Sequence, residues 1–170
     1  MKMKKWICGL FAIVLVLCAG CTAPERFGMQ ELSRRLGEQN ERYAFSLDGV
    51  SLYNEYYHIP FSLEQEEDLL LSCKEDDKGQ LIQLLLTAEK DTAPTDDFLA
   101  FSLLLLEVFC NVSSYEAAAL AEQAGLTGED VLFTDHTGTA EKGRYSFTFF
   151  STPLSITAIF TYDDAVVAEG

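Results

Sequence analysis

Apolar residues recur with the helical period of about 3.6 in three segments of this chain. Spacings of three and four residues, with charged residues between them, predict a short amphipathic helix over 29–40. The segment 96–110 is apolar around most of a helix circumference, which predicts a central core helix. Ser113 and Glu116 form a capping-box pair at the start of the alanine-rich segment 114–123, which predicts a third helix.

Alternating apolar and polar residues, typical of half-buried strands, occupy the segments between these helices. The first alternation covers 43–47 and resumes over 50–57, with the pair Asp48-Gly49 between them. Because Asp-Gly between two apolar runs favours a tight turn, we expect a first hairpin there. Pro60 lacks a backbone N–H, so we expect it to end the second strand or to mark a sheet edge.

A second hairpin is expected from the apolar segments 69–74 and 80–88, which flank a polar turn. Leu70 and Leu85 are expected on one face, so the sheet should be central or covered on both faces. The residues expected on the other face are Leu69, Leu71 and Cys73 on the first strand and Ile82, Leu84 and Leu86 on the second.

Strand alternation returns over 131–162, with turns expected near 139–143 and at Pro153. Runs of strands separated by runs of helices predict an α+β fold in the order α-ββ-ββ-αα-βββ. We expect a mainly antiparallel sheet of about six or seven strands with two to three helices packed against it. The length fits a single domain over 29–165, followed by a frayed tail over 166–170.

The first 20 residues differ in composition from the rest of the chain. Three lysines within the first five residues precede an apolar run over 6–17. This run is shorter than the roughly 20 residues that span a bilayer, and small residues follow it. These features are typical of a secretory signal peptide, so we expect 1–20 to be removed and 21–28 to form a tether.

The signal segment ends in Cys18-Ala19-Gly20-Cys21, which resembles the lipobox of bacterial lipoproteins. Cys18 stands where that family usually has leucine. The resemblance implies that Cys21 receives a diacylglyceryl group and becomes the mature amino terminus. It also implies a domain held on the extracytoplasmic face of the cell membrane, or at the outer membrane of a two-membrane cell. An ordinary cleaved signal and an uncleaved anchor are the alternatives.

The charge balance excludes one class of partner. The chain has a net charge of −15, and loss of the three signal lysines makes it −18. An acidic domain is unsuited to nucleic acid, because such binding depends on neutralising phosphates. Acidic side chains also keep an exported domain soluble, which is the simplest explanation of the charge.

Two cysteines remain for the domain once the signal is removed and Cys21 is acylated. Cys73 and Cys110 both lie in strongly apolar segments, so we expect two buried thiols. A single disulfide between them is the alternative, because an extracytoplasmic location permits it.

The aromatic group around His58 is the one candidate for a binding surface. It combines Tyr53, Tyr56, Tyr57 and Phe61, and tyrosine is enriched at protein interfaces. On one continuous strand, Tyr53 and Tyr57 would share a face and Tyr56 would lie on the other. The alternative is that one of these faces belongs to the core.

The sequence shows no clear pattern of catalytic or metal-binding residues. The two histidines, His58 and His136, have no second histidine or cysteine nearby, so we expect no metal site and no cofactor. We therefore expect a non-enzymatic envelope lipoprotein that binds an envelope protein or a cell-wall component. The alternative is a small envelope hydrolase that pairs an acid group with one of these histidines.

Overall fold

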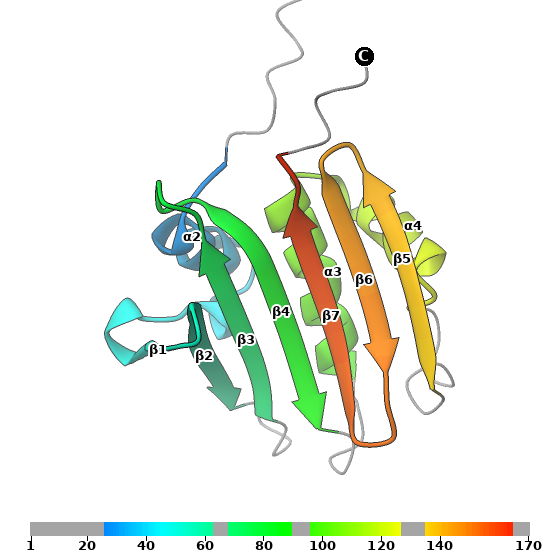
Figure 1. Cartoon of the computed structure of the whole chain (residues 1–170), viewed down its shortest axis with the longest axis horizontal. Helices are drawn as coiled ribbons and strands as arrows, with labels where there is room; N and C mark the ends of the chain where they lie inside the picture. Colours follow the sequence, from blue (N-terminus) through cyan, green and yellow to red (C-terminus); the bar gives the residue numbers. More distant parts are fainter. Residues whose placement is uncertain (1–25, 63–67, 90–95, 127–134, 165–170) are drawn as a thin grey trace, which may run out of the picture.

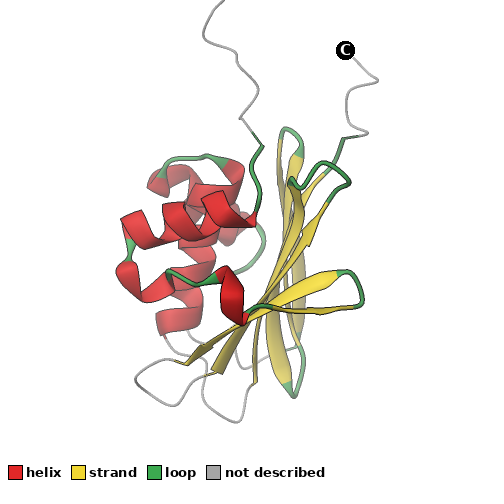
Figure 2. Cartoon of the chain, turned by 90° about the vertical axis from the view of Figure 1, so that its left-hand side faces the viewer, coloured by secondary structure: helices red, strands yellow, loops and turns green. Residues whose placement is uncertain are grey.

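A seven-stranded antiparallel sheet carries three α-helices on one of its faces in the computed structural model (Figure 1, Figure 2). The structure describes residues 26–62, 68–89, 96–126 and 135–164. The predicted α+β fold and its order of elements are confirmed. The helices are α2 (Met29–Gln39), α3 (Asp96–Cys110) and α4 (Ser114–Gln123), and two 3-10 turns are η1 (Glu41–Tyr43) and η2 (Leu47–Gly49).

The sheet joins two groups of sequential strands. In the order β1-β2-β3-β4-β7-β6-β5, the chain crosses from β4 through α3 and α4 to the far edge and returns to pair β7 with β4. Every neighbouring pair is antiparallel. The strands are β1 (Ser51–Tyr53), β2 (Tyr56–Ser62), β3 (Asp68–Glu75), β4 (Leu81–Glu89), β5 (His136–Lys142), β6 (Tyr145–Ser151) and β7 (Ser155–Tyr162).

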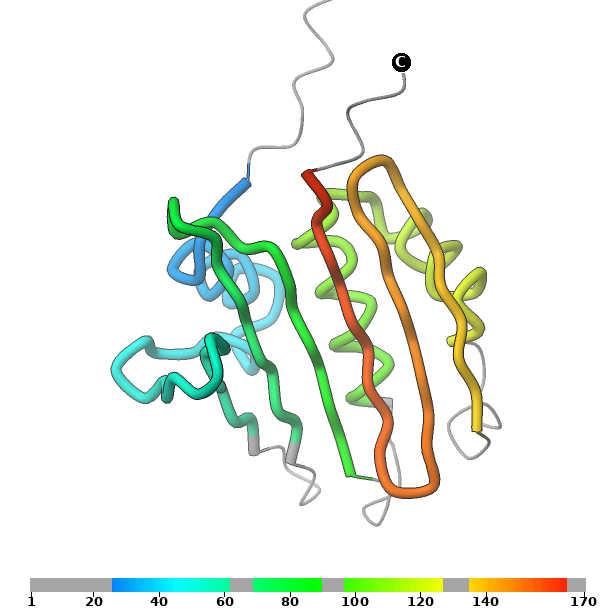
Figure 3. The backbone as a smooth tube through the Cα atoms, viewed as in Figure 1, coloured from blue at the N-terminus to red at the C-terminus, as the bar shows by residue number. Residues whose placement is uncertain are grey.

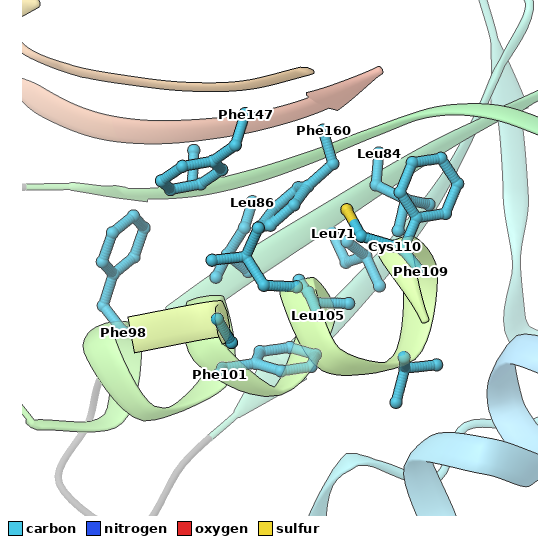
Figure 4. Packing of buried hydrophobic residues seen from close by; sticks show 14 of the residues in the cluster. Leu71, Leu84, Leu86, Phe98, Phe101, Leu105, Phe109, Cys110, Phe147 and Phe160 are labelled. Atoms are coloured by element: carbon cyan, nitrogen blue, oxygen red, sulfur yellow. The ribbon is translucent and has the colours of Figure 1, made fainter. Parts of the chain in front are cut away.

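The predicted core helix lies against the middle of the sheet. Phe98, Phe101 and Leu105 of α3 are fully buried, and they face the side chains of the sheet in Figure 4. Leu106 and Phe109 extend the buried surface of the helix around its circumference. The sheet residues labelled in the same view are Leu71, Leu84, Leu86, Phe147 and Phe160, and all are at most 1% exposed.

The first hairpin does not lie where the Asp-Gly pair predicted it. The segment 43–47 is not a strand but joins η1 to η2. Tyr43 is 2% exposed, and its ring stacks on Phe101 with 4.0 Å between centroids. The hairpin turn falls instead at Asn54 and Glu55, which both have positive φ, as a type I′ turn requires. The strands on either side of this turn are β1 and β2.

Pro60 does not end its strand. β2 continues to Ser62, but β1 pairs with it only as far as His58. Pro60 therefore lies on a stretch where β2 forms the sheet edge and its missing N–H removes no ladder bond with β1. The edge alternative for this proline is confirmed.

The second hairpin is confirmed, except that Leu81 faces the core in place of Ile82. The register shifts between Lys74 and Glu75, which pair with Gln83 and Leu81 and leave Ile82 without a partner. Such a bulge changes which side chains face the core. Leu81 is 2% exposed and takes the core position expected for Ile82.

The β5–β6 turn is shorter than the segment 139–143 predicted. β5 continues to Lys142 and pairs there with Tyr145, so only Gly143 and Arg144 form the turn. Gly143 has a φ of 60°, which glycine adopts without strain. The turn at Pro153 lies between β6 and β7 as expected.

The capping box of α4 is confirmed and also ties the helix to the sheet. The Ser113 hydroxyl accepts from the Glu116 backbone N–H, and the Glu116 carboxylate accepts from the Ser113 N–H at 3.1 Å. Lys142 of β5 donates to the other oxygen of Glu116 at 2.6 Å. The Lys142 ammonium, with the Ser113 groups, lowers the pKa of Glu116 from 4.5 to about 2.

We predict that this carboxylate contributes to stability in a defined pH range. Because its folded pKa is below its ordinary value, its contribution is full above about pH 4.5 and is lost as pH falls towards about 2. Glu116→Gln should lower the thermal midpoint by a few degrees at pH 7 and by much less near pH 2, measured by circular dichroism. Glu122→Gln, an exposed carboxylate on the same helix, is the control. Equal losses at both pH values would contradict the prediction.

Candidate functional site: the clamped junction and the open sheet face

The described chain begins with an arginine held by three groups at one end of the sheet. Arg26 is 13% exposed, and its guanidinium donates to Asp76 at 2.8 Å and to Asp164 at 3.4 Å. Its guanidinium carbon also lies 4.4 Å from the centre of the Tyr162 ring. Backbone N–H donation from Gln80, assisted by Arg26, lowers the pKa of the Asp76 carboxyl. The start and the end of the described chain therefore meet at one end of the sheet (Figure 3).

We call the contacts of Arg26 with Asp76, Asp164 and Tyr162 the clamp. Backbone contacts extend this clamp into α2. The Phe27 carbonyl accepts from the Leu81 N–H at 2.9 Å, so the segment before the helix pairs with the start of β4. The Glu75 carboxylate accepts from the Met29 N–H at 2.8 Å. This carboxylate satisfies one free amide at the positive end of α2, which stabilises the start of the helix. Residues 26–29 are thus fixed to the β3–β4 turn.

The aromatic group is divided between the two faces of the sheet. Because the hairpin turn lies between Tyr53 and Tyr56, these two residues pair and lie, with His58, on the side of the sheet opposite the helices. Tyr57 lies on the helix-covered face, and Phe61 is 7% exposed within the core. The prediction that Tyr53 and Tyr57 share a face is therefore wrong. The candidate surface is reduced to Tyr53, Tyr56 and His58.

The β1–β2 hairpin projects on the open side of the sheet as an arm (Figure 2). The Tyr56 hydroxyl donates to the Gln83 side chain on β4, so the arm bends across β3. Lys74 of β3 donates to Glu55 at the tip of the arm at 2.7 Å. His58 contacts the Ser72 hydroxyl through Nδ1 at 2.9 Å. These bonds hold the arm to the sheet, and Tyr53 remains 68% exposed.

Within the described ranges, helices cover one face of the sheet, which corrects the expectation that it is central or covered on both sides. The part of the chain that the structure describes places no helix on the opposite face (Figure 2). We call this opposite surface, on the five strands from β3 to β5, the open face. Its residues form three rows: Lys74, Gln83, Thr161, Ser146 and Glu141; Ser72, Leu85, Ile159, Thr148 and Thr139; and Leu70, Thr87, Thr157, Phe150 and Thr137.

The open face is nearly free of charge on a strongly acidic protein. Of its fifteen residues only Lys74 and Glu141 are charged, and Lys74 is paired with Glu55 of the arm. Leu85 and Ile159 lie in its second row and Leu70 and Phe150 in its third, and Leu70 is 37% exposed. Depletion of charge together with apolar and aromatic residues is the compositional sign of a protein interface.

Hydroxyl groups on the open face are bonded to one another. Thr87 and Thr157 lie 3.3 Å apart, and Thr139 and Thr148 lie 3.0 Å apart, between their hydroxyl oxygens. Gln83 donates to Thr161 at 3.3 Å in the neighbouring row. These bonds reduce the number of donors and acceptors that the face offers to a ligand.

The two histidines lie apart and neither contacts a carboxylate within the described ranges. His58 contacts Ser72, and His136 lies with Nε2 3.3 Å from the carbonyl oxygen of Ala124 at the end of α4. The hydrolase alternative requires a histidine within hydrogen-bond reach of an acid group in a cavity. No group of three or more metal-ligating side chains occurs among the described residues either.

Both cysteines of the domain are buried and unpaired, as we expected. Burial raises the pKa of the Cys73 thiol far above its ordinary value and that of Cys110 to about 12. The thiolate is the reactive form, so neither cysteine suits a nucleophile or a redox site.

A concavity of about 640 Å³ lies beside the clamp, between the start of α2, η2 and the β3–β4 turn. Its charged groups are already paired. The pKa of Glu31 is lowered to about 2 by hydrogen bonds from Arg34 and Arg35, and Glu75 accepts from Met29. The residues that line it are Gly28, Met29, Gln30, Glu31, Arg34, Leu47, Glu75 and Gly79.

Within the described ranges no single helix is long and apolar enough to cross a bilayer. The pair α3 and α4 passes by length and composition together, but it is bent by 114°. Comparisons with protein-family models, curated proteins and solved structures found no match to this chain.

We predict that the clamp depends on a close approach at Gly28. A Cβ atom there would lie 2.5 Å from the backbone oxygen of Gly79, so the junction would have to move. Gly28→Ala should cost about 1–3 kcal/mol of unfolding free energy, as overpacking does, measured by urea denaturation. Gly49→Ala is the matched control, because a Cβ there meets nothing within 4 Å. A similar effect of both substitutions would contradict the close-approach argument.

Proposed function

We propose that this protein is a lipid-anchored lipoprotein of the cell envelope with a non-enzymatic binding role on the extracytoplasmic side of the membrane. The observation that carries the proposal is the placement of Cys21 only five residues before the clamped Arg26. At about 3.4 Å per residue, the clamp lies within about 17 Å of the lipid attachment site. A short tether and a fixed junction would hold the domain close to the membrane surface.

This arrangement would orient the domain on the membrane. The clamp lies at the end of the sheet that also holds the β3–β4 turn, and the strands run away from that end (Figure 1). With lipid on Cys21, the strands would stand roughly upright on the bilayer and the open face would point sideways. Partners in the same membrane would meet this face directly.

We favour binding over hydrolysis because the open face resembles an interface, whereas the histidines and the concavity beside α2 lack the features of a hydrolase site. The histidines bond to a serine and to a backbone carbonyl, and the concavity beside α2 holds carboxylates that already accept hydrogen bonds. The open face, in contrast, has the charge depletion of an interface, with Phe150 on it and Tyr53 and Tyr56 on the adjoining arm. An envelope protein is the partner class that this surface supports.

Replacing Cys21 tests the anchor. Cys21→Ser should abolish incorporation of labelled palmitate and should release the protein from the membrane fraction. Two acyl chains supply a membrane affinity that this acidic domain does not replace. Cys8→Ser, the same change within the signal segment, should leave labelling and fractionation as in the unchanged protein. A mature protein with an unmodified Cys21, found by mass spectrometry, would refute the lipoprotein proposal.

A further inference from the structure

We propose that the outer edge of β5 binds an extended, positively charged segment of a partner protein, which adds to the sheet as a further strand. We call the backbone N–H and C=O groups of Thr137, Thr139 and Glu141 the β5 edge. That the partner belongs to the cell envelope rests on the proposed function, whereas the pairing at this edge does not.

The groups of the β5 edge point away from the sheet. β5 is the last strand in the sheet order, and its one described neighbour is β6 (Figure 1). The two-residue turn at Gly143 and Arg144 closes on Lys142 and Tyr145 as a hydrogen-bonded pair. Bonded and non-bonded pairs alternate along an antiparallel ladder, so the residues of the β5 edge belong to the non-bonded pairs. In the described part of the chain, no backbone group of another element bonds to them.

The two edges of the sheet differ in their protection against pairing with another chain. At the opposite edge, β1 has only three residues, and Pro60 lies on the stretch of β2 beyond it. Short edge strands and prolines are devices that prevent such pairing. β5 has seven residues without proline, and its register with β6 is unbroken over all seven. The β5 edge is therefore long and regular enough to accept an added strand.

The β5 edge is accessible and held in an extended form. Its three residues are all exposed. On the helix-covered side, α4 contacts both ends of the strand. Lys142 donates to Glu116 at 2.6 Å, and His136 Nε2 lies 3.3 Å from the carbonyl oxygen of Ala124. Because β5 is already ordered between these contacts and β6, a partner strand pays little to organise it.

Charge determines which kind of segment suits this edge. Asp135 and Glu141 are exposed carboxylates near the two ends of β5, and the described residues supply an ion-pair partner to neither. Lys142, the lysine of the strand, is already paired with Glu116. The net charge of −15 on the whole chain adds long-range attraction for cations. A basic segment is therefore favoured, and an acidic one, including a second copy of this chain, is repelled.

A synthetic peptide tests the β5 edge. The probe is acetyl-Lys-Thr-Val-Thr-Val-Thr-Lys-amide with a fluorescent label, and the protein is the full-length, lipidated chain in nanodiscs of zwitterionic lipid. We expect binding by fluorescence anisotropy that weakens as salt rises, because salt screens the attraction. A peptide with glutamate in place of both lysines should bind about tenfold more weakly. Empty nanodiscs are the blank.

Loss of a backbone donor distinguishes strand pairing from attraction by charge alone. Thr139→Pro removes an outward N–H without breaking a bond to β6, so it should weaken peptide binding about tenfold, the scale of one or two lost hydrogen bonds. Thr139→Val loses the same hydroxyl and keeps the N–H, so the difference between these variants reports the backbone donor. If Thr139→Pro does not fold, as judged by circular dichroism, N-methylation of alternate peptide residues tests the same bonds on the unchanged protein.

Two further measurements locate the bound peptide. The amides of Thr139 and Glu141 should exchange with solvent hydrogen more slowly when the peptide is present, because the added strand accepts from them. Glu141→Gln should weaken binding at low salt, because it removes a carboxylate from the edge. Asp48→Asn makes the same change at an exposed carboxylate in η2, which precedes β1 at the opposite edge, and is the matched control.

The outcomes separate this inference from the proposed function. Palmitate labelling of the same protein reports the anchor independently. The edge proposal is overturned if the peptide does not bind at low salt, binds equally after loss of the backbone donors, or protects amides outside β5. Association of two copies through the β5 edge in place of the peptide also overturns it. Peptide binding by protein with an unmodified Cys21 supports the edge proposal and refutes the lipoprotein proposal.

Discussion

The burial of α3 is the constraint on which the rest of this structure depends. The helix is apolar around most of its circumference, so contact with the sheet alone would leave much of it in water. α2 and α4 both contact it, and the ring of Tyr43 stacks on Phe101 from the segment after α2. The requirement to surround one helix therefore draws every described helix to one side of the sheet (Figure 2).

This one-sided cover explains the unusual composition of the opposite surface. Strand residues that face the helices are leucine, phenylalanine and alanine with almost no exposure. Their neighbours along each strand are threonines, serines and a few apolar residues, with only two charges in three rows. A sheet that faced only water would hold more charged residues. The open face is therefore less adapted to water than a fully exposed sheet surface would be.

The clamp fixes the start of the described chain at one end of the sheet. Arg26 bridges the β3–β4 turn and the residues after β7, so the described chain begins and ends at the same end of the sheet (Figure 3). A flexible junction would let an anchored domain present any side to the membrane. If Cys21 carries lipid as proposed, a fixed junction at Arg26 would limit how the domain turns relative to the bilayer.

The sequence by itself determined the features that depend on neighbouring residues. The bounds of α3, the capping box at Ser113 and the hairpin of β3 and β4 follow from periodicity and local hydrogen bonds. The lipobox-like residues before Cys21 likewise lie within one short segment. These signals need no knowledge of the rest of the fold, because each of them is made over a few adjacent residues.

Only the tertiary structure decided which side each strand residue faces. The hairpin turn lies at Asn54 and Glu55 rather than at Asp48-Gly49, and this register divides the tyrosines between two faces. Tyr43 packs on α3 instead of joining a strand. The bulge at Ile82 depends on pairing between two strands, and the open face depends on where three helices pack. Each outcome is set by contacts between segments distant in sequence, and a change of one residue in register reverses every face.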